Sequence, residues 1–422
     1  MLIDGFTSAL MAIEGITDSH VFLHGPGGCR LYHMIFAASA FPRLSREGTY
    51  SYNVPYFFGH PRIPCSYIDG SDYVDGAYWK LEEGLGFVKD RNASIMVVID
   101  SPGASLIGDD CCKAIHADGL DDDAFHLDQW LISTSASDGF DMVLTQVLEK
   151  YCEEPREKVS GRVNILGLSV MDRDWTVVKK EISDVLSSMG LEAGCFLGAG
   201  CTLDEIRKTS SASANITLCP EMSTRQAKYL EDRFGIPCIR SDYGSLVGFD
   251  AVRDAINKLA AHFGKDPSGA LALLEEKEHR IFDIFIGTSG LSSRFRGMTF
   301  SVAGMPSIVL ALTEWLYDFL LLVPKSIAVD KGDSECVEKL KSFLSSIGCE
   351  NALKDQSLEA DLLFADEPTS RMREAKGLCK AGVPIGFSYG GMSVLPRPMY
   401  MASGAMHLLD ETTRALRGFD SH

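Results

Sequence analysis

The sequence contains no Cys-x-x-Cys pair and no Gly-x-x-x-x-Gly-Lys-Ser/Thr phosphate loop. The first absence excludes a zinc ribbon and a local ferredoxin-type motif, because both need cysteines at close spacing. Because the phosphate loop is absent, we expect any ATP chemistry to belong to a partner protein. Any metal site must therefore be assembled from distant segments or from two chains.

The sequence also lacks a surplus of basic residues and a long apolar run. Its formal net charge of −18 argues against nucleic acid as a partner, because binding to phosphates needs a basic surface. The most apolar stretch, 308–323, is interrupted by Glu314 and Asp318 and is short for a membrane span, so we expect a buried helix there. No secretory leader is recognised at the start, so we expect a cytoplasmic protein without a membrane segment.

Cysteine is plentiful, with twelve residues in a chain of 422. A cytoplasmic protein of this size does not use such cysteines as a disulfide framework. Most of them are therefore interpreted as small buried apolar residues. The exceptions are cysteines placed in loops that follow strands, where ligands usually bind.

One such cysteine ends the opening stretch of the chain. A short apolar strand at 21–23 leads into His24-Gly25-Pro26-Gly27-Gly28-Cys29, and a helical pattern follows at 31–40. Three glycines and a proline allow the backbone to approach a bulky group closely, with the thiol at the tip of the turn. Cys29 is therefore a candidate site residue.

Strands and helices alternate along the whole chain. The run at 94–100 has the continuous apolar character of a parallel strand buried on both faces, and a similar strand is expected at 163–168. The last expected strand covers 383–388, and 57–65 is expected to be a loop. This pattern predicts an α/β protein with three units, which we place at 1–157, 158–264 and 265–422.

Four fragments, in order, resemble the nitrogenase component 1 superfamily. The fragments are Gly15–Asp18 with His24–Cys29, Ser101–Asp110, Ala214–Ile216 with Gly235–Pro237, and Pro384–Phe387. The resemblance covers nearly the whole chain. It implies three Rossmann-like domains, each a mainly parallel sheet flanked by helices.

The resemblance also implies a function. Members of this superfamily form homodimers or pair with a paralogous component 1 subunit, and an iron–sulfur cluster of the 4Fe-4S type lies at the interface. A separate ATP-dependent iron-protein reductase donates electrons, and the substrate is reduced between the domains, where a second metal cofactor or a tetrapyrrole binds. The chain is thus expected to be a nitrogenase-like oxidoreductase component. The alternative is a non-catalytic scaffold or carrier for the assembly of a metal cofactor.

The sequence departs from the family pattern at the cluster ligands. The family has three cysteines, and only the second, Cys29, is present; the resemblance expects the first near Asp4 or Gly5 and the third near Ser101 and Pro102. Because some relatives use an aspartate, Asp4 is a candidate ligand. Cys65 lies in another loop of the first domain, and Cys29 with Cys65 from each of two chains would complete four ligands. The alternative is that Cys65 is a packed loop residue.

Two further residues are expected at cofactor sites. Cys219 resembles the cysteine that holds the active-site cofactor in the molybdenum-iron protein, although the companion histidine of the last domain is missing. Cys219 is therefore either a cofactor ligand or a core residue. His24 is a proton donor, a residue that fixes the turn, or a partner of the cluster sulfurs.

Overall fold

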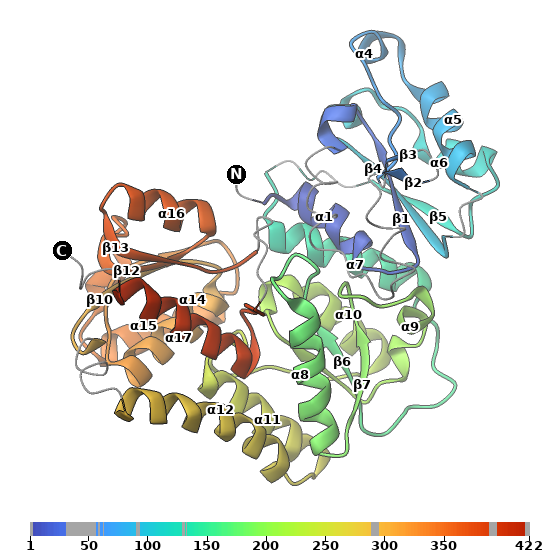
Figure 1. Ribbon diagram of the computed structural model, residues 1–422. Helices are drawn as coiled ribbons and strands as arrows, with labels where there is room; N and C mark the ends of the chain where they lie inside the picture. Colours follow the sequence, from blue (N-terminus) through green and yellow to red (C-terminus); the bar gives the residue numbers. More distant parts are fainter. Residues whose placement is uncertain are drawn as a thin grey trace.

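The structure of the protein is a computed structural model that describes residues 3–30, 56–57, 60–61, 63–89, 93–128, 131, 133–287, 295–387 and 395–417 (Figure 1). Three parallel sheets with helices packed around them make up these residues. The predicted α/β class with three sheets is confirmed. The helix expected at 31–40 lies outside the described residues.

The first sheet contains β1 (Ser19–His24), β4 (Ile95–Asp100) and β5 (Ala124–Leu127), in the order β1-β4-β5. Alternate residues of β1 point to opposite faces, since Phe22 belongs to one buried cluster and Leu23 to another. Burial on both faces is the reason that β4 is apolar almost throughout, as the sequence predicted.

Helices cover both faces of this sheet. On the Phe22 face lie α5 (Tyr78–Val88) and α6 (Cys111–Ala117). On the Leu23 face lie α1 (Gly5–Glu14) and α7 (Ala136–Tyr151), which also pack against each other. The sheet therefore sits between two helical layers, and its carboxyl edge carries the loops that hold the candidate site.

The second sheet has the order β7-β6-β8-β9. Its strands are β6 (Arg162–Leu166), β7 (Glu192–Phe196), β8 (Ala214–Thr217) and β9 (Cys238–Ile239), and the connecting helices are α8 (Trp175–Ser188), α9 (Leu203–Arg207) and α10 (Thr224–Phe234). The strands and helices expected in this part of the chain are confirmed to within a few residues.

The third sheet has the order β11-β10-β12-β13. Its strands are β10 (Thr299–Gly304), β11 (Val323–Val329), β12 (Ala360–Ala365) and β13 (Cys379–Pro384), and the helices around it are α14 (Pro306–Leu320), α15 (Ser334–Ser346), α16 (Glu367–Ala375) and α17 (Met401–Arg417). Two further helices, α11 (Phe249–Phe263) and α12 (Ser268–Gly287), connect the second and third units: α11 contacts β9 and α17, and α12 contacts α8 and α17. All ladders within the three main sheets are parallel.

Three sequence expectations need correction. The last strand is β13 at 379–384 and not 383–388, because Gly386 has a left-handed φ of 80° that turns the chain away from the sheet. The buried helix ends at Leu320, since Leu321 adopts φ 56° and β11 begins two residues later. The stretch 57–65 contains part of a two-strand antiparallel ladder, β2 (Tyr56–Phe57) with β3 (His60–Pro61), where only a loop was expected.

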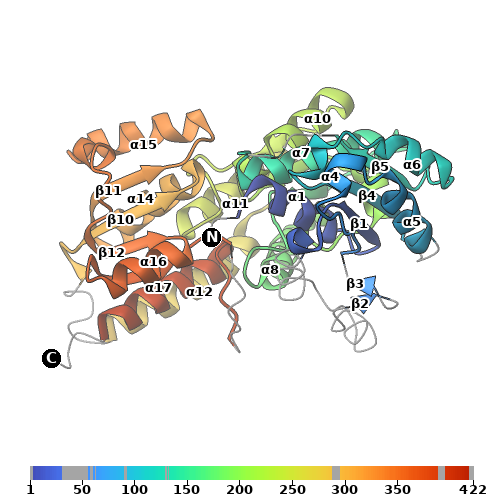
Figure 2. The same cartoon turned by 90° about the horizontal axis from the view of Figure 1, so that it is seen from above.

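A single large apolar cluster joins residues of all three sheets. The amino-terminal end of the described chain lies between the first and third units, as both ribbon views show (Figure 2). The unit boundaries at 157 and 264 stay predictions. Among the described residues, no helix is long and apolar enough to cross a membrane.

Candidate functional site

The turn after β1 lies beside a second segment that is distant in sequence. Residues 64–68 run alongside the end of β1: the N–H of Leu23 donates to the carbonyl of Pro64 at 2.9 Å, and the N–H of Ser66 donates back to Leu23 at 3.1 Å. This added ladder continues the sheet by a few residues. It places Cys65 next to the turn that carries Cys29.

His24 fixes this turn through side chains. Its Nε2 lies 3.0 Å from a carboxylate oxygen of Asp109, and its Nδ1 lies 2.9 Å from the hydroxyl of Ser66. A carboxylate only accepts, so Nε2 carries the proton and Nδ1 accepts from Ser66. The Ser66 hydroxyl in turn accepts from the N–H of Gly25 at 3.0 Å. These contacts fit the alternative in which His24 fixes the turn.

Cys29 and Cys65 form the central pair of the candidate site. Burial raises the pKa of Cys29. Burial also raises the pKa of Cys65, whereas the backbone of Tyr67 and the guanidinium of Arg30 lower it; the nearby Cys29 raises it slightly. The bridge between Leu23 and Cys65 places Cys65 beside the turn that carries Cys29. The role of this pair as metal ligands stays a prediction.

Arg30 was not predicted from the sequence. It follows Cys29 directly, and its guanidinium lies 5.2 Å from the centre of the Tyr67 ring. The same guanidinium contacts the Cys65 thiol and favours its thiolate form. Tyr67 has a left-handed φ of 53°, which is unusual for a large residue and positions its ring over the turn.

Gly5, one of the two positions where the resemblance expects the first cysteine, has no room for a side chain. A Cβ on Gly5 would lie 2.8 Å from Cβ of Thr134 and 2.9 Å from the carbonyl of Ser135. A Cβ on Gly139 would lie 2.1 Å from the carbonyl of Gly5. The backbones of α1 and α7 therefore meet at Gly5, which explains sterically why no thiol occurs there.

Ser101, near which the resemblance expects the third cysteine, is a buried serine. The N–H of Ser101 donates to the carbonyl of His24 at 2.8 Å, and its hydroxyl accepts from the N–H of Ala104 at 3.2 Å. Ser101 thus links the end of β1 to the first residue of the short helical turn at 104–106. Asp109, which binds His24, begins no helix, whereas Asp110 caps α6.

Asp4 caps α1. Its carboxylate accepts from the N–H of Thr7 at 2.8 Å, and its backbone pairs with Ser135. The side chain is exposed. A capping role accounts for this residue, and its predicted role as a metal ligand stays a prediction.

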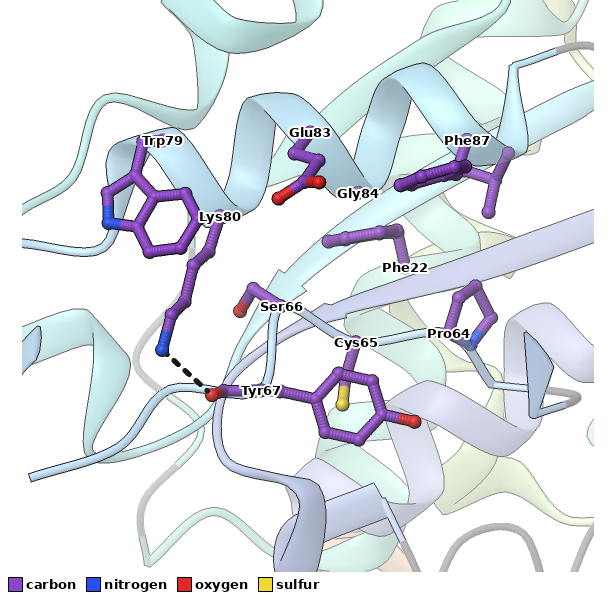
Figure 3. A pocket seen from close by; sticks show the side chains of 11 residues that line it. Phe22, Pro64, Cys65, Ser66, Tyr67, Trp79, Lys80, Glu83, Gly84 and Phe87 are labelled. Carbon is purple, nitrogen blue, oxygen red and sulfur yellow. Dashed lines mark hydrogen bonds between the residues drawn. The ribbon is translucent and has the colours of Figure 1, made fainter.

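A pocket of about 290 Å³ opens beside Cys65 (Figure 3). Cys65, Ser66 and Tyr67 form one wall, and α5 forms the other with Trp79 and Phe87. The ammonium group of Lys80 on α5 donates to the carbonyl of Tyr67 at 3.3 Å and so ties the two walls together (Figure 3).

A larger cavity of about 420 Å³ lies between the first and third units. Its floor is formed by residues that follow the strands of the third sheet: Ala303, Gly304, Met305, Asp330, Lys331, Asp366, Ile385, Gly386 and Phe387. Ile3 and the start of α7 face them from the first unit. Ligands of open parallel sheets bind at this carboxyl edge. Burial raises the pKa of Asp330, and the nearby Asp366 raises it further.

Cys219 lies behind the wall of this cavity. It is fully buried, and its sulfur is 3.9 Å from that of Met305, which lines the cavity, and 3.6 Å from Glu221. The carboxylate of Glu221 accepts from the hydroxyl and the N–H of Ser307. Burial raises the pKa of Cys219 well above its usual range, and the carboxylates of Glu221 and Asp172 add to the effect. Its predicted role as a cofactor ligand stays a prediction.

Comparisons with known proteins agree with this architecture. The family model described as "Nitrogenase component 1 type Oxidoreductase" matches residues 5–417. The chain therefore belongs to the nitrogenase component 1 family, and the resemblance noted in the sequence is confirmed. The family includes members named as reductases and a member named for cofactor biosynthesis.

Individual relatives are distant. The chain is 23% identical over 267 residues to one of the subunits of the light-independent protochlorophyllide reductase from Pelodictyon phaeoclathratiforme, covering 60% of this chain and 46% of that protein. It is 22% identical over 272 residues to the nitrogenase iron-molybdenum cofactor biosynthesis protein NifE of Clostridium pasteurianum, covering 62% of this chain and 54% of that protein. The chain thus spans about half the length of these curated relatives.

A solved structure titled "Nitrogenase Cp1 at pH 6.5" has the same fold. It superposes with a TM-score of 0.74 at 17% identity, covering 99% of this chain and 94% of that one. At this identity the likeness concerns the fold. The arrangement of three sheets is therefore that of nitrogenase component 1.

Proposed function

We propose that this chain is part of a nitrogenase-like oxidoreductase that receives electrons at a dimer interface and delivers them to a substrate bound between its domains. The observation that carries this proposal is the bridge between Leu23 and Cys65, which places Cys65 beside the turn that carries Cys29. Thiolates are the usual ligands of iron–sulfur clusters.

The two thiols fit half of a cluster site. A two-fold axis beside the turn would bring the same pair from a second copy, or from a paralogous subunit, and would complete four ligands. Asp4 is a further candidate ligand. The cluster, when bound, supplies one-electron transfer at low potential.

The residues around the pair prepare it for a metal. Burial raises the pKa of Cys65, and the guanidinium of Arg30 offsets part of this rise, which favours the thiolate that a metal needs. His24, held by Asp109 and Ser66, fixes the backbone that carries Cys29. Because the sequence contains no phosphate loop, ATP-driven electron delivery belongs to a separate reductase of the iron-protein type.

The cavity between the units is the proposed place of the substrate. Among the described residues that line it there is no cysteine or histidine, and Cys219 is shielded by Met305. These residues do not fit a permanently bound metal cofactor, so no step is assigned to one. They fit an organic substrate such as a tetrapyrrole, with Asp330, Lys331 and Asp366 as its polar contacts.

The lack of soft ligands also favours the second candidate function. A scaffold or carrier needs a cavity that releases its cargo, and Gly5 and Ser101, near which the resemblance expects the first and third cysteines, pack closely or hydrogen-bond within the structure. In this case the protein holds a cofactor precursor temporarily and catalyses no reduction.

Anaerobic purification with candidate partner subunits tests the cluster. We expect about two iron atoms per chain, since one four-iron cluster is shared by two chains. Cys29→Ser and Cys65→Ser should remove the iron and the visible absorbance, whereas Cys349→Ser, at another half-buried cysteine, should leave both unchanged. Iron-free protein under all these conditions, or iron retained in Cys29→Ser, would overturn the proposed site.

A second measurement separates enzyme from scaffold. The iron-loaded protein is mixed with an iron-protein-type reductase and MgATP, and oxidation of the reductase is followed in the visible spectrum. Oxidation that depends on this chain supports the reductase function. Absence of oxidation with a loaded cluster supports the scaffold.

A further inference from the structure

Three side chains with metal-ligand chemistry converge at the carboxyl edge of the first sheet, apart from the Cys29–Cys65 pair. Asp100 ends β4, His126 lies in the neighbouring β5, and Cys111 is the first residue of α6. One ligand atom from each lies within 4.8 Å of the other two. The Nε2 of His126 is 2.9 Å from one oxygen of Asp100, and the sulfur of Cys111 is 3.4 Å from the other.

We propose that Asp100, Cys111 and His126 bind one divalent transition-metal ion of the zinc type. A sulfur, a nitrogen and an oxygen donor suit Zn²⁺ and its spectroscopic substitute Co²⁺, whereas Mg²⁺ and Ca²⁺ take oxygen ligands only. The three ligands leave a fourth tetrahedral position for water or another small ligand.

The spacing of the three residues is compatible with a tetrahedral ion. Bond lengths of about 2.0 Å to nitrogen and oxygen and about 2.3 Å to sulfur place neighbouring tetrahedral ligands about 3.3–3.6 Å apart. His126 and Cys111 contact different oxygens of Asp100, at 2.9 and 3.4 Å, and one ligand atom from each residue lies within 4.8 Å of the other two. Binding of the ion therefore requires the side chains to rotate until one atom from each reaches the tetrahedral spacing.

The burial and the charge of the three side chains also support a metal site. Cys111 is 1% exposed, while the side chains of His126 and Asp100 are 11% and 17% exposed, so the cluster is enclosed except on one side. The carboxylate and the thiolate balance the two positive charges of the ion, and neutral imidazole adds none. Binding releases the thiol proton of Cys111 to solvent as the metal–sulfur bond forms.

The neighbouring residues show that the arrangement is specific. Cys112 adjoins Cys111 but is exposed and is not part of the cluster. His116, on the same helix, forms an exposed pair with Asp121, at 80% and 58% side-chain exposure. Cys112 and His116 carry a thiol and an imidazole on α6 but lie outside the cluster. They therefore serve as matched controls for Cys111 and His126.

Titration of the metal-free full-length protein with Co²⁺ under reducing conditions tests the site. We expect one equivalent of Co²⁺ to give a thiolate-to-cobalt charge-transfer band. Cys111→Ser should abolish the band, and Asp100→Asn and His126→Gln should weaken binding by more than the roughly 10–100-fold seen for outer-shell changes. Cys112→Ser and His116→Ala should leave binding unchanged.

Circular dichroism establishes which variants fold. If Cys111→Ser does not fold, the binding affinities of Asp100→Asn and His126→Gln decide the outcome. Cys29→Ser should leave the cobalt band intact, which separates this site from the proposed iron–sulfur site. The proposal would be overturned if the folded wild-type protein gave no cobalt band. It would also be overturned if the band survived in Cys111→Ser and disappeared in Cys112→Ser or Cys29→Ser. In either case Asp100, Cys111 and His126 form a hydrogen-bonded cluster only.

Discussion

Gly25 and Ser101 approach so closely that a Cβ on Gly25 would lie 2.6 Å from the hydroxyl oxygen of Ser101. The contact joins the turn after β1 to the loop after β4. Both segments belong to fragments that resemble the family, and the resemblance expects the third cysteine near Ser101. The glycine-rich turn therefore packs closely against this loop, in addition to any role in a metal site.

Gly25→Ala should destabilise the protein by about 1–3 kcal/mol, because the added methyl group overlaps Ser101 in a fully packed place. Gly28→Ala is the control, since a Cβ there meets nothing within 4 Å and should change stability by at most about 0.5 kcal/mol. Urea unfolding measures both. Equal midpoints for the two variants would contradict the packing argument.

Cysteines introduced at Gly5 and at Ser101 should have different effects on the stability of the protein. Gly5→Cys should cost about 3 kcal/mol, because its Cβ would press on Thr134 and the carbonyl of Ser135. Ser101→Cys should cost only about 1 kcal/mol, the value of one hydrogen bond to Ala104. Thermal unfolding of the two variants tests this order; a Gly5→Cys protein as stable as Ser101→Cys would refute it.

Much of the fold follows from local patterns in the sequence. The apolar run that became β4 predicts a strand because both of its faces are buried. Cys29 and Cys65 were paired because both were expected in loops of the first domain and a two-fold axis would complete four ligands, and their role as ligands stays a prediction. The strand β13 was misplaced because Ile385 and Phe387 are apolar yet line the cavity between the first and third units, on either side of the turn at Gly386.

Other parts of the site depend on contacts that sequence spacing does not reveal. The partners of His24 lie 42 and 85 residues away, at Ser66 and Asp109. The short strand β5 follows a run of aspartates and has only four residues, so no pattern placed His126 beside Asp100. Clusters of this kind become visible only when the register of the strands is known.

Asp4 has a capping role that one pair of variants separates from a ligand role. Asp4→Ala should lose about 1 kcal/mol of stability through the missing acceptor for Thr7, whereas Asp4→Ser keeps an acceptor and should lose little. If Asp4 is also a metal ligand, both variants lose iron under anaerobic conditions. Full iron content in Asp4→Ser would exclude the ligand role and leave the cap.

Asp172 makes stability depend on pH. It is buried beside Cys219 and Tyr400, and burial raises its pKa to about 7 although its carboxylate accepts from the N–H of Ser169 at 2.8 Å. Its ordinary value is 3.8, so between about pH 4 and pH 7 the folded state holds a proton that the unfolded state has released. The contribution of Asp172 to the free energy of unfolding therefore decreases as pH rises through this window, by at most about 4 kcal/mol.

Asp172→Asn should remove this dependence, because the amide oxygen can still accept from Ser169 but does not ionise. The variant should match the wild type near pH 4 and exceed its stability near pH 8 in urea unfolding. Asp141 and Glu314 also have raised pKa values, of about 6 and about 7, but they are common to both proteins and cancel in the difference. Asp266→Asn, at an exposed carboxyl whose pKa is lowered by Ser268, should gain nothing at pH 8. Parallel pH profiles for the wild type and Asp172→Asn would show that Asp172 is ionised in the folded protein throughout this range.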